Sequence, residues 1–382
     1  MRRALLLVIA LAIAFVLSGQ ANALPDKGYD REQFQRDLDI RHRAGVIGVH
    51  GRIITGSGPD IVASSGFADL GTRRPVDPRG HYRIASNTKT FVATAVLQLV
   101  GDGRLGLDDT LERHLPGAVP GGAAITLRQL LQHTSGIANY HRGLPPANAE
   151  NFERDRYRHY PPEELVRIAV SLGPDFPPGT KWSYSNTGYT LIGMVIDKVT
   201  GRSWRDHVRE RIIAPLRLKD TSIPDRDPRL PRPHAKGYVQ WTPGGPLTDA
   251  TDHSPSTSNS AGEIISTSKD LSTFVRALLR GDVLRPDLLA EMKRTVPSGA
   301  AEFGDYGLGI ARVALSCGGE YWSHGGNGAG YVSREAFAPD GSHGVAMGFS
   351  GITGRTMEEL MSHGPAVRAQ LDRVMCGLRK IN

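Results

Sequence analysis

Hydrophobic residues recur at helical spacing along residues 82–100. The apolar positions that would share one face of a helix are Phe91, Val92, Ala95, Val96, Leu99 and Val100. This spacing matches the period of an amphipathic or buried α-helix. Gly101 and Gly103 follow the run and favour the end of a helix there. The pattern therefore predicts one buried helix, around which the other elements can be arranged.

Shorter apolar runs predict further elements on both sides of this helix. On its N-terminal side, Arg31–Arg43 has the pattern of a helix, and Val46–Ile54 and residues 61–67 have the pattern of two strands. Toward the C-terminus, short strand-like runs separated by Gly-rich turns cover residues 306–314, 321–324, 330–338 and 344–350. A helical tail is predicted after Arg355, with a break at Gly364-Pro365.

Strands at both ends of the chain around a helical middle are typical of an α+β protein. We expect an antiparallel sheet flanked by helices, with residues 24–105 and 262–382 forming this α/β lobe. Residues 106–261 would form an inserted α-rich lobe that carries active-site loops. Two polar, Pro-rich stretches of the insert, residues 141–162 and 223–260, are predicted to border the site. The site itself would lie where the lobes meet.

The first 23 residues are predicted to be a secretory signal peptide. Arg2 and Arg3 precede an apolar run, and Ala21-Asn22-Ala23 has the pattern of a cleavage site. The alternative is an uncleaved membrane anchor, which the short apolar run disfavours. We therefore expect a secreted protein, cleaved near Ala23, with no stable membrane insertion.

Composition excludes some partners and cofactors. The 382 residues carry a formal net charge of +7, and the basic residues are scattered, so nucleic acid is not an expected partner. In an exported protein the two cysteines, Cys317 and Cys376, would most simply form one disulfide, with two buried thiols as the alternative. The cysteines lack zinc-site spacing and no His-Glu-x-x-His occurs, so neither a metal nor another cofactor is expected.

A hydroxyl and an amine occur together at the start of the central helix. Ser86 and Lys89 are three residues apart and would share one face. Burial and the positive end of the helix dipole disfavour the ammonium form of Lys89, which can then accept the proton of Ser86. The pattern alone is weak, because it recurs at Ser266 and Lys269, where the hydroxyls are more simply helix N-caps. By the same alternative, Ser86 is an N-cap and Lys89 a solvated charge.

Tyr184 and Asn186 precede another apolar helical face. The phenol of Tyr184 can relay protons with Lys89, and the Asn186 amide can bind the lysine and the substrate. In the alternative interpretation Tyr184 is a packing aromatic and Asn186 an N-cap. His133, at the end of a short predicted helix, is more typical of a structural histidine than of a catalytic base.

His324 ends a predicted strand and precedes Gly325, Gly326 and Asn327. Glycines in an edge strand allow the backbone of a ligand to approach and pair with it. His324 can supply the proton-donating or cationic group of such a site. The alternative is a simple Gly-rich turn.

Taken in order along the chain, these three motifs resemble those of the serine β-lactamase and penicillin-binding protein group. The likeness covers nearly the whole chain after the signal peptide, and it is greatest to the secreted streptomycete D-alanyl-D-alanine carboxypeptidases. In that group the serine forms an acyl-enzyme, and the other side chains transfer protons or orient the substrate. The catalytic residues that the resemblance implies are Ser86, Lys89, Tyr184, Asn186 and His324. It also implies an oxyanion hole from the backbone N–H groups of Ser86 and Asn327, and it fits a disulfide between the two cysteines.

The expected substrate-binding positions depart from the carboxypeptidase pattern. In those enzymes an arginine on the preceding strand and threonines around the third motif bind the terminal carboxylate. The corresponding residues here are Ala311, Gly325 and Asn327. Arg312 is one residue away, and a shift of one residue in a strand points a side chain to the opposite face. The predicted substrate-binding residues are Gly325, Gly326, Asn327 and Arg312.

The resemblance implies a secreted serine D,D-carboxypeptidase-type hydrolase. Its substrates would be small or peptidoglycan-like D-amino-acid peptides, and β-lactam antibiotics would be covalent ligands. An esterase or β-lactamase with the same catalytic groups is the main alternative, favoured by the missing carboxylate ligands. A non-hydrolytic penicillin-binding sensor is a further alternative, disfavoured because every catalytic group is present.

Overall fold

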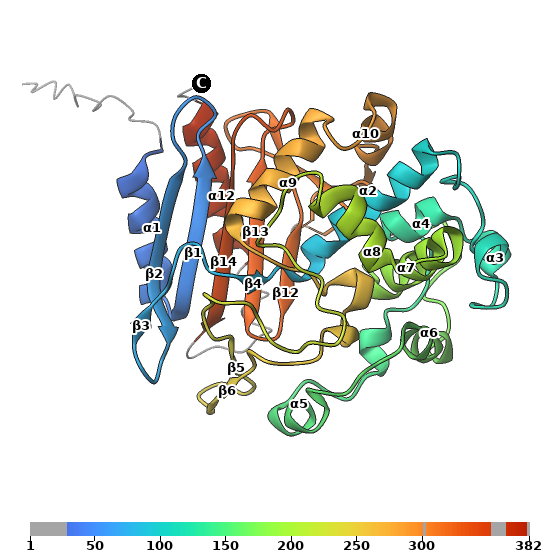
Figure 1. Ribbon diagram of the computed structural model, residues 1–382, viewed down its shortest axis with the longest axis horizontal. Helices are drawn as coiled ribbons and strands as arrows, with labels where there is room; N and C mark the ends of the chain where they lie inside the picture. The colour runs from blue at the N-terminus through green and yellow to red at the C-terminus, as the bar shows by residue number, and fades with distance from the viewer. Residues whose placement is uncertain (1–28, 301–302, 353–363, 380–382) are drawn as a thin grey trace, which may run out of the picture.

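The structure is a computed structural model that describes residues 29–300, 303–352 and 364–379 (Figure 1). The predicted signal peptide lies outside the described residues, as does the first part of the predicted helical tail. Among the helices of the described ranges, none combines the length and apolarity that a membrane span needs.

One large antiparallel sheet contains strands from both ends of the chain. Its order is β3-β2-β1-β14-β13-β11-β10-β9-β8, and β12 pairs with β13 beside this path. At its centre, β1 and β14 pair with Val49 opposite Phe349, and this pairing joins the two ends of the chain. The strand bounds are β1 (Val46–Ile54), β2 (Ile61–Asp69), β3 (Arg74–Pro75), β8 (Val296–Pro297), β9 (Asp305–Tyr306), β10 (Ala311–Ala314), β11 (Glu320–Ser323), β12 (Gly325–Gly328), β13 (Tyr331–Phe337) and β14 (Gly344–Ile352).

Helices cover both faces of this sheet. On one face lie α1 (Arg31–Arg43) and α12 (Gly364–Arg379), and on the other lies α9 (Ser268–Arg280) (Figure 1). Phe34 and Leu38 of α1 and Val374 of α12 are buried in one apolar cluster with the central strands. Because each sheet face buries its apolar side chains under helices, the predicted α+β class and the sheet built from both termini are confirmed.

The middle of the chain forms a helical region beside the sheet, with the predicted buried helix at its core. That helix was predicted to start at Ser86, and it begins at Thr88, directly after the 3₁₀ turn Ala85–Asn87. Residues 141–162 contain a short helix that the loop prediction missed. The helices of this region are α2 (Thr88–Gly101), α3 (Leu111–His114), α4 (Leu127–Gln132), α5 (Ala149–Asp155), α6 (Pro162–Ser171), α7 (Asn186–Thr200), α8 (Trp204–Val208) and, after α9, α10 (Pro286–Met292).

Two small two-stranded sheets and one disulfide connect further parts of the chain. Strand β4 (Tyr82–Arg83) pairs with β7 (Ile265–Ser266), and β5 (Tyr238–Gln240) pairs with β6 (Leu247–Asp249). Cys317 and Cys376 form a disulfide, which ties the β10–β11 connection to α12. The predicted disulfide is therefore present.

Candidate active site

Ser86 lies in the turn between strand β4 and helix α2. The residue before it, Ala85, has a φ of +46°, in the left-handed region that few non-glycine residues adopt. Ile84 donates its backbone N–H to Ile264 O at 3.1 Å, which anchors the start of the turn. Strained backbone of this kind persists only where its surroundings hold it, and it is common at functional sites. The turn presents Ser86 half-buried at the N-terminus of a buried helix.

Lys89, one turn along, makes three polar contacts. Its Nζ lies 3.0 Å from Ser86 Oγ, 2.7 Å from Asn186 Oδ1 and 2.7 Å from the carbonyl oxygen of Ala261. The side chain is completely buried. Among the described residues no carboxylate pairs with it within 4 Å. The amine is therefore held by neutral acceptors alone.

Burial without a counter-charge lowers the pKa of Lys89 well below 10.5, because the protein interior disfavours the ammonium form. A neutral amine has two N–H donors and one lone pair. In that form Lys89 donates to Asn186 Oδ1 and Ala261 O and accepts the hydroxyl proton of Ser86. The arrangement is that of a nucleophile and its base.

Tyr184 lies against the same lysine. Nζ of Lys89 is 4.8 Å from the centre of the Tyr184 ring, which stacks on Phe303 at 5.1 Å and contacts His133 at 4.3 Å. Burial raises the pKa of Tyr184, and a hydrogen bond with Ser86 opposes this in part. The raised pKa keeps the phenol protonated at neutral pH, whereas burial favours the neutral form of Lys89. Of the two candidate bases, Lys89 is therefore the one whose deprotonated form the site favours.

Asn186 is the first residue of α7, and its side chain reaches back to Lys89. The N-cap is Ser185, and no side chain caps this helix end, so the alternative interpretation of Asn186 as an N-cap is wrong. His133 occupies a structural position instead: it is buried beneath Tyr184, and its Nδ1 accepts the backbone N–H of Ser185 at 3.2 Å. Burial lowers the pKa of His133 well below its usual value, so its ring is neutral.

His324 is buried and hydrogen-bonded at both ring nitrogens. Nε2 lies 2.8 Å from the Tyr306 hydroxyl, and Nδ1 lies 2.7 Å from Gly325 O. Burial and the nearby Lys89 lower the pKa of His324 to about 3. The lowered pKa disfavours the predicted cationic form of His324 at physiological pH, and its proton-donating role stays a prediction. A neutral imidazole at this place can fix the start of β12 through Gly325.

The glycines after His324 form β12, which among the described strands pairs only with β13. Gly326 lies so close to the Ser86 turn that a Cβ there would be 2.1 Å from Ile84 O. The free edge of β12 therefore stands next to the nucleophile. Asn327, which follows, places its backbone in the same strand, in register with Val332.

Two cavities, of about 510 and 540 Å³, meet at these residues. Ser86, Asn186 and Asn327 line both cavities. The first extends beneath the predicted rim and is bordered by Phe152 and Trp241. The second runs along β10 and β11 and is bordered by Ala311 and Arg334, among others. A substrate can therefore extend to either side of Ser86.

The beta-lactamase family matches residues 34–361 of the chain. The protein belongs to the beta-lactamase family. The fold, the pairing of Ser86 with the buried Lys89, and this match together make it a serine hydrolase of that family.

Two solved structures of amide-hydrolysing enzymes are similar to this chain. A D-stereospecific amidohydrolase from Streptomyces sp. is 37% identical, with a TM-score of 0.79 over 88% of this chain and 98% of that chain. The D-amino acid amidase from Ochrobactrum anthropi SV3 is 29% identical, with a TM-score of 0.80 over 91% of this chain and 97% of that chain.

Among characterised sequences, penicillin-binding protein 4* of Bacillus subtilis is 32% identical over 50% of this chain and 42% of its own length. Penicillin-binding protein 4 of Amycolatopsis lactamdurans is 31% identical over 59% of this chain and 57% of its own length. The matches thus span about half of these relatives. The relatives support the family but not the specific likeness to streptomycete D-alanyl-D-alanine carboxypeptidases, so that part of the prediction was too narrow.

One predicted substrate-binding residue of this beta-lactamase-family site points away from it. Arg312 is exposed on β10 and pairs with Asp305 at 2.6 Å and, more distantly, with Glu320 at 3.9 Å. Its neighbour Ala311 is buried and lines the cavity. Successive residues of a strand face opposite sides, so Arg312 cannot replace an arginine at position 311. The prediction that Arg312 binds substrate is wrong.

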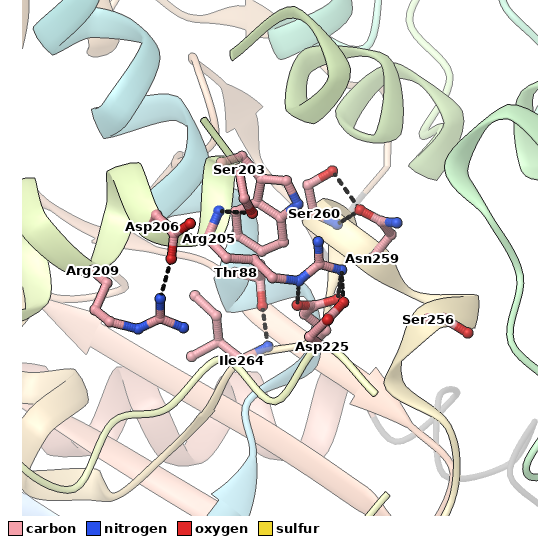
Figure 2. Close-up of polar contacts among 12 residues, drawn as sticks. Thr88, Ser203, Arg205, Asp206, Arg209, Asp225, Ser256, Asn259, Ser260 and Ile264 are labelled. Carbon is pink, nitrogen blue, oxygen red and sulfur yellow. Dashed lines mark hydrogen bonds and ion pairs between the residues drawn. The ribbon is translucent and has the colours of Figure 1, made fainter. Parts of the chain in front are cut away.

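Residues 261–264, which include the carbonyl group of Ala261, are fixed by polar contacts that the sequence motifs did not indicate. Ile264 N–H donates to Thr88 Oγ1 at 3.1 Å, and Arg205 approaches Asp225 at 3.4 Å (Figure 2). Arg205 also donates to both carboxylate oxygens of the buried Glu263, at 2.5 and 2.8 Å. These bonds fix Ile264 against the start of α2, which carries Lys89, and Glu263 against α8.

Glu335 of β13 is a further buried group that motif reasoning missed. Its Oε1 accepts the backbone N–H of His324 at 2.9 Å, in place of a ladder bond between strands. Burial raises the pKa of Glu335 to about 8. Its other oxygen and Asn87 Oδ1 have no partner among the described residues. Two adjacent charged residues, Arg334 and Glu335, inside a predicted strand were the available signal.

Proposed function

We propose that the protein is a D-stereospecific serine amidohydrolase that cleaves amide or peptide bonds next to D-amino acids through an acyl-enzyme. The observation that carries the proposal is the buried, uncompensated Lys89, hydrogen-bonded to Ser86 Oγ at 3.0 Å. The 37% identity to a D-stereospecific amidohydrolase over nearly that enzyme's whole length supports the substrate class. The carboxypeptidase activity predicted from the sequence is one form of this reaction.

In the proposed reaction, Ser86 Oγ attacks the scissile carbonyl carbon while its proton passes to Lys89 Nζ. The backbone N–H groups of Ser86 and Asn327 donate to the oxyanion that forms. The C–N bond then breaks, and the leaving nitrogen receives the proton from Lys89 through the Tyr184 hydroxyl. Water attacks the resulting ester, its proton returns to the oxygen of Ser86, and the carboxylic acid is released.

The experiment compares D- and L-alanine amide, and N-acetyl-D-alanyl-D-alanine with its L,L form, as substrates of the wild type and Ser86→Ala. We expect hydrolysis of at least one D substrate, little of the L forms, and none by Ser86→Ala. Ser266→Ala is the matched control and should keep its activity. Equal rates on both enantiomers, or hydrolysis by Ser86→Ala, would contradict the proposal.

We further propose that β-lactams acylate Ser86. A β-lactam is an internal amide whose opening leaves the acyl group on the serine, so the same nucleophile and base apply. Intact-mass measurement after incubation with benzylpenicillin should show one adduct, absent from Ser86→Ala. Rapid penicillin turnover with no cleavage of the D substrates would instead favour the β-lactamase alternative.

Export is likewise a proposal. It is supported by the pattern of residues 1–23 and by the Cys317–Cys376 disulfide, since disulfides persist mainly outside the cytoplasm. Expression of the full chain in an exporting bacterium, followed by N-terminal sequencing of protein from the medium, should give a chain that begins at Leu24. Retention of the full chain in the cell would contradict this.

A further inference from the structure

Strand β13 carries two buried polar side chains on one face, those of Ser333 and Glu335. Residues two apart in a strand face the same side. Ser333 is 0% exposed and Glu335 is 1% exposed. Buried polar groups are nearly always hydrogen-bonded, and the partners of these two lie in the Ser86 turn and at the start of β12.

The hydroxyl of Ser333 links β13 to the Ser86 turn at two points. It donates to Ile84 O at 2.8 Å and accepts a hydrogen bond from Nδ2 of Asn87 at 2.7 Å. Ile84 O also accepts the backbone N–H of Asn87 at 3.2 Å, which closes the turn. Ser86 lies between these two residues. One hydroxyl group is therefore bonded to residues that precede and follow the nucleophile.

Strand β12 packs directly against the same group of atoms. Gly326 is opposite Ser333 in the β12–β13 pair. A Cβ at Gly326 would be 2.1 Å from Ile84 O and 2.5 Å from Ser333 Oγ, so only a glycine allows this close approach. The contact sets how near β12 lies to the Ser86 turn.

Glu335 fixes the residue that leads into β12. The register of β13 with β11 and β12 places His324 opposite Glu335. Here the carboxyl oxygen Oε1, in place of a backbone carbonyl, accepts the His324 N–H at 2.9 Å. Burial raises the pKa of Glu335 to about 8, and the nearby amide of Asn87 opposes this in part. The bond therefore needs an acceptor at this place but no full negative charge.

The two donors assigned to the oxyanion hole belong to the two elements that these bonds join. The N–H of Ser86 is part of the turn, and the N–H of Asn327 is part of β12. Such donors stabilise a transition state only when they already lie where the negative charge develops. The relative position of the turn and β12 therefore determines whether both donors can reach one oxygen.

We propose that Ser333 and Glu335 are positioning residues that hold the backbone N–H groups of Ser86 and Asn327 in the geometry that binds the oxyanion. Ser333 acts on the Ser86 turn, and Glu335 acts on the start of β12. Neither is among the residues that line the two cavities, so neither contacts the substrate. The inference rests on the proposed function, because it concerns the oxyanion hole of that reaction.

The test uses p-nitrophenyl acetate and phenylboronic acid, two probes that need the nucleophile and the oxyanion hole but no D-amino acid. The boronic acid forms a bond from Ser86 Oγ to boron, the hydroxyl proton passes to Lys89, and the tetrahedral product resembles the transition state. Ser333→Ala should lower kcat for the ester roughly 10–100-fold, leave KM within about threefold, and weaken inhibition by the boronic acid by a factor similar to the loss in kcat.

Two further variants separate positioning from general stability. Ser333→Thr keeps the hydroxyl and should recover most of the loss. Ser350 is a buried serine of the neighbouring strand β14, and its hydroxyl donates to Gly48 O at 3.3 Å. Ser350→Ala should therefore leave kcat and the affinity for the boronic acid within about threefold of the wild type.

A Ser333→Ala protein that is folded by circular dichroism and keeps both kcat and the affinity for the boronic acid would overturn the proposal. A loss confined to KM, or equal losses in Ser350→Ala, would also overturn it. A wild type that reacts with neither probe would refute the assignment of the oxyanion hole and the proposal with it.

Glu335 is tested by exchanging its carboxyl group for an amide or an alkyl group. Glu335→Gln keeps an acceptor for the His324 N–H and should retain kcat within about threefold, whereas Glu335→Leu should lower kcat about tenfold or more. Equal losses in the two variants would overturn the role of Glu335. If Glu335→Leu does not fold, the Ser333 variants decide the proposal.

The two proposals can fail separately. If the wild type hydrolysed the ester but no D-amino-acid substrate, the proposed function would fail, and a loss in Ser333→Ala on the two probes would still support positioning. If the D substrates were cleaved and Ser333→Ala lost nothing, the proposed function would stand and the positioning role would be overturned.

Discussion

Ser86 and Lys89 share their spacing with Ser266 and Lys269, and both pairs stand at the start of a helix. Their surroundings differ completely. Lys89 is completely buried and bonded to Ser86, Asn186 and Ala261. Lys269 is exposed. The same four-residue pattern therefore produces a nucleophile with its base in one place and an ordinary helix start in the other.

Ser266 and Lys269 have the same spacing, but they have structural roles only. Ser266 is buried in β7, where its hydroxyl lies 2.8 Å from Thr221 Oγ1. The N-cap of α9 is Thr267, whose hydroxyl accepts the backbone N–H of Asp270 at 3.2 Å. The predicted capping role of this stretch is confirmed. Catalytic chemistry depends on burial of the lysine, because an exposed lysine stays protonated near neutral pH.

The two serines give the largest expected contrast. Ser86→Ala removes the nucleophile, so hydrolysis should fall on the order of 10⁴-fold or more. Ser266→Ala should leave kcat/KM within about threefold and lower the free energy of unfolding by about 1 kcal/mol, through the lost bond to Thr221. Steady-state kinetics and urea unfolding measure the two effects. Comparable losses of activity in both variants would contradict the assignment of Ser86 as the nucleophile and Ser266 as a structural residue.

The two lysines should differ almost as much. Lys89→Met removes the base while keeping an apolar chain in the buried site, and kcat/KM should fall about 10³-fold. Lys269→Met changes an exposed side chain, and neither activity nor stability should change measurably. Circular dichroism shows whether each variant is folded. Full activity in Lys89→Met would mean that Tyr184 or water acts as the base.

Much of the fold follows from local patterns in the sequence. Arg31–Arg43 and Val46–Ile54 have the predicted bounds, and the buried helix at 88–101 follows from its apolar face. The short helix Ala149–Asp155 was missed because none of its residues is buried, so it has no apolar periodicity to recognise. Local signals identify elements that pack on the core, and they fail for elements on the rim.

The site was predictable where its residues are close in sequence or form a recognisable motif. Contacts that are made by backbone atoms, or between residues of different strands, could not be predicted. Ala261 binds Lys89 through its carbonyl oxygen, an atom that every residue has. Arg312 was predicted because it is one residue from the position of the arginine in the carboxypeptidases. Arg334 was not considered, and it lines the cavity from β13, which the pairing with β12 brings there. Such register cannot be read from one sequence without the fold.

The pH dependence sharpens the contrast between the lysines. Because the pKa of Lys89 is lowered well below 10.5, its active neutral form persists down to a pH well below that of an exposed lysine. The rate of Ser86 acylation by benzylpenicillin should rise with pH up to this lowered pKa and then level off, falling about tenfold per unit below it. Ionisation of Tyr184 should not lower the acylation rate near neutral pH, since the pKa of this phenol is raised. A midpoint near 10 would contradict the assignment of Lys89.

The smallest expected effect concerns the contacts that position Ala261, whose carbonyl oxygen accepts a hydrogen bond from Lys89. Glu263 follows Ala261 by two residues, is buried, and binds Arg205 through both carboxylate oxygens. Arg202 and Glu210 form a similar two-oxygen pair, at 2.6 and 2.7 Å, but at the exposed surface. The buried pair should therefore matter for both stability and activity, and the exposed pair for neither.

Glu263→Gln should lower the free energy of unfolding by about 3 kcal/mol, because it leaves Arg205 partly unpaired in the interior. By loosening residues 261–264 it should also lower kcat about tenfold at a temperature where the variant is folded. Glu210→Gln is the control and should match the wild type in both. If Glu263→Gln lost stability but kept kcat, the contacts with α2 alone would be enough to position Ala261 O. The difference between Lys89 and Lys269 would then depend only on the helix and on the burial of Lys89.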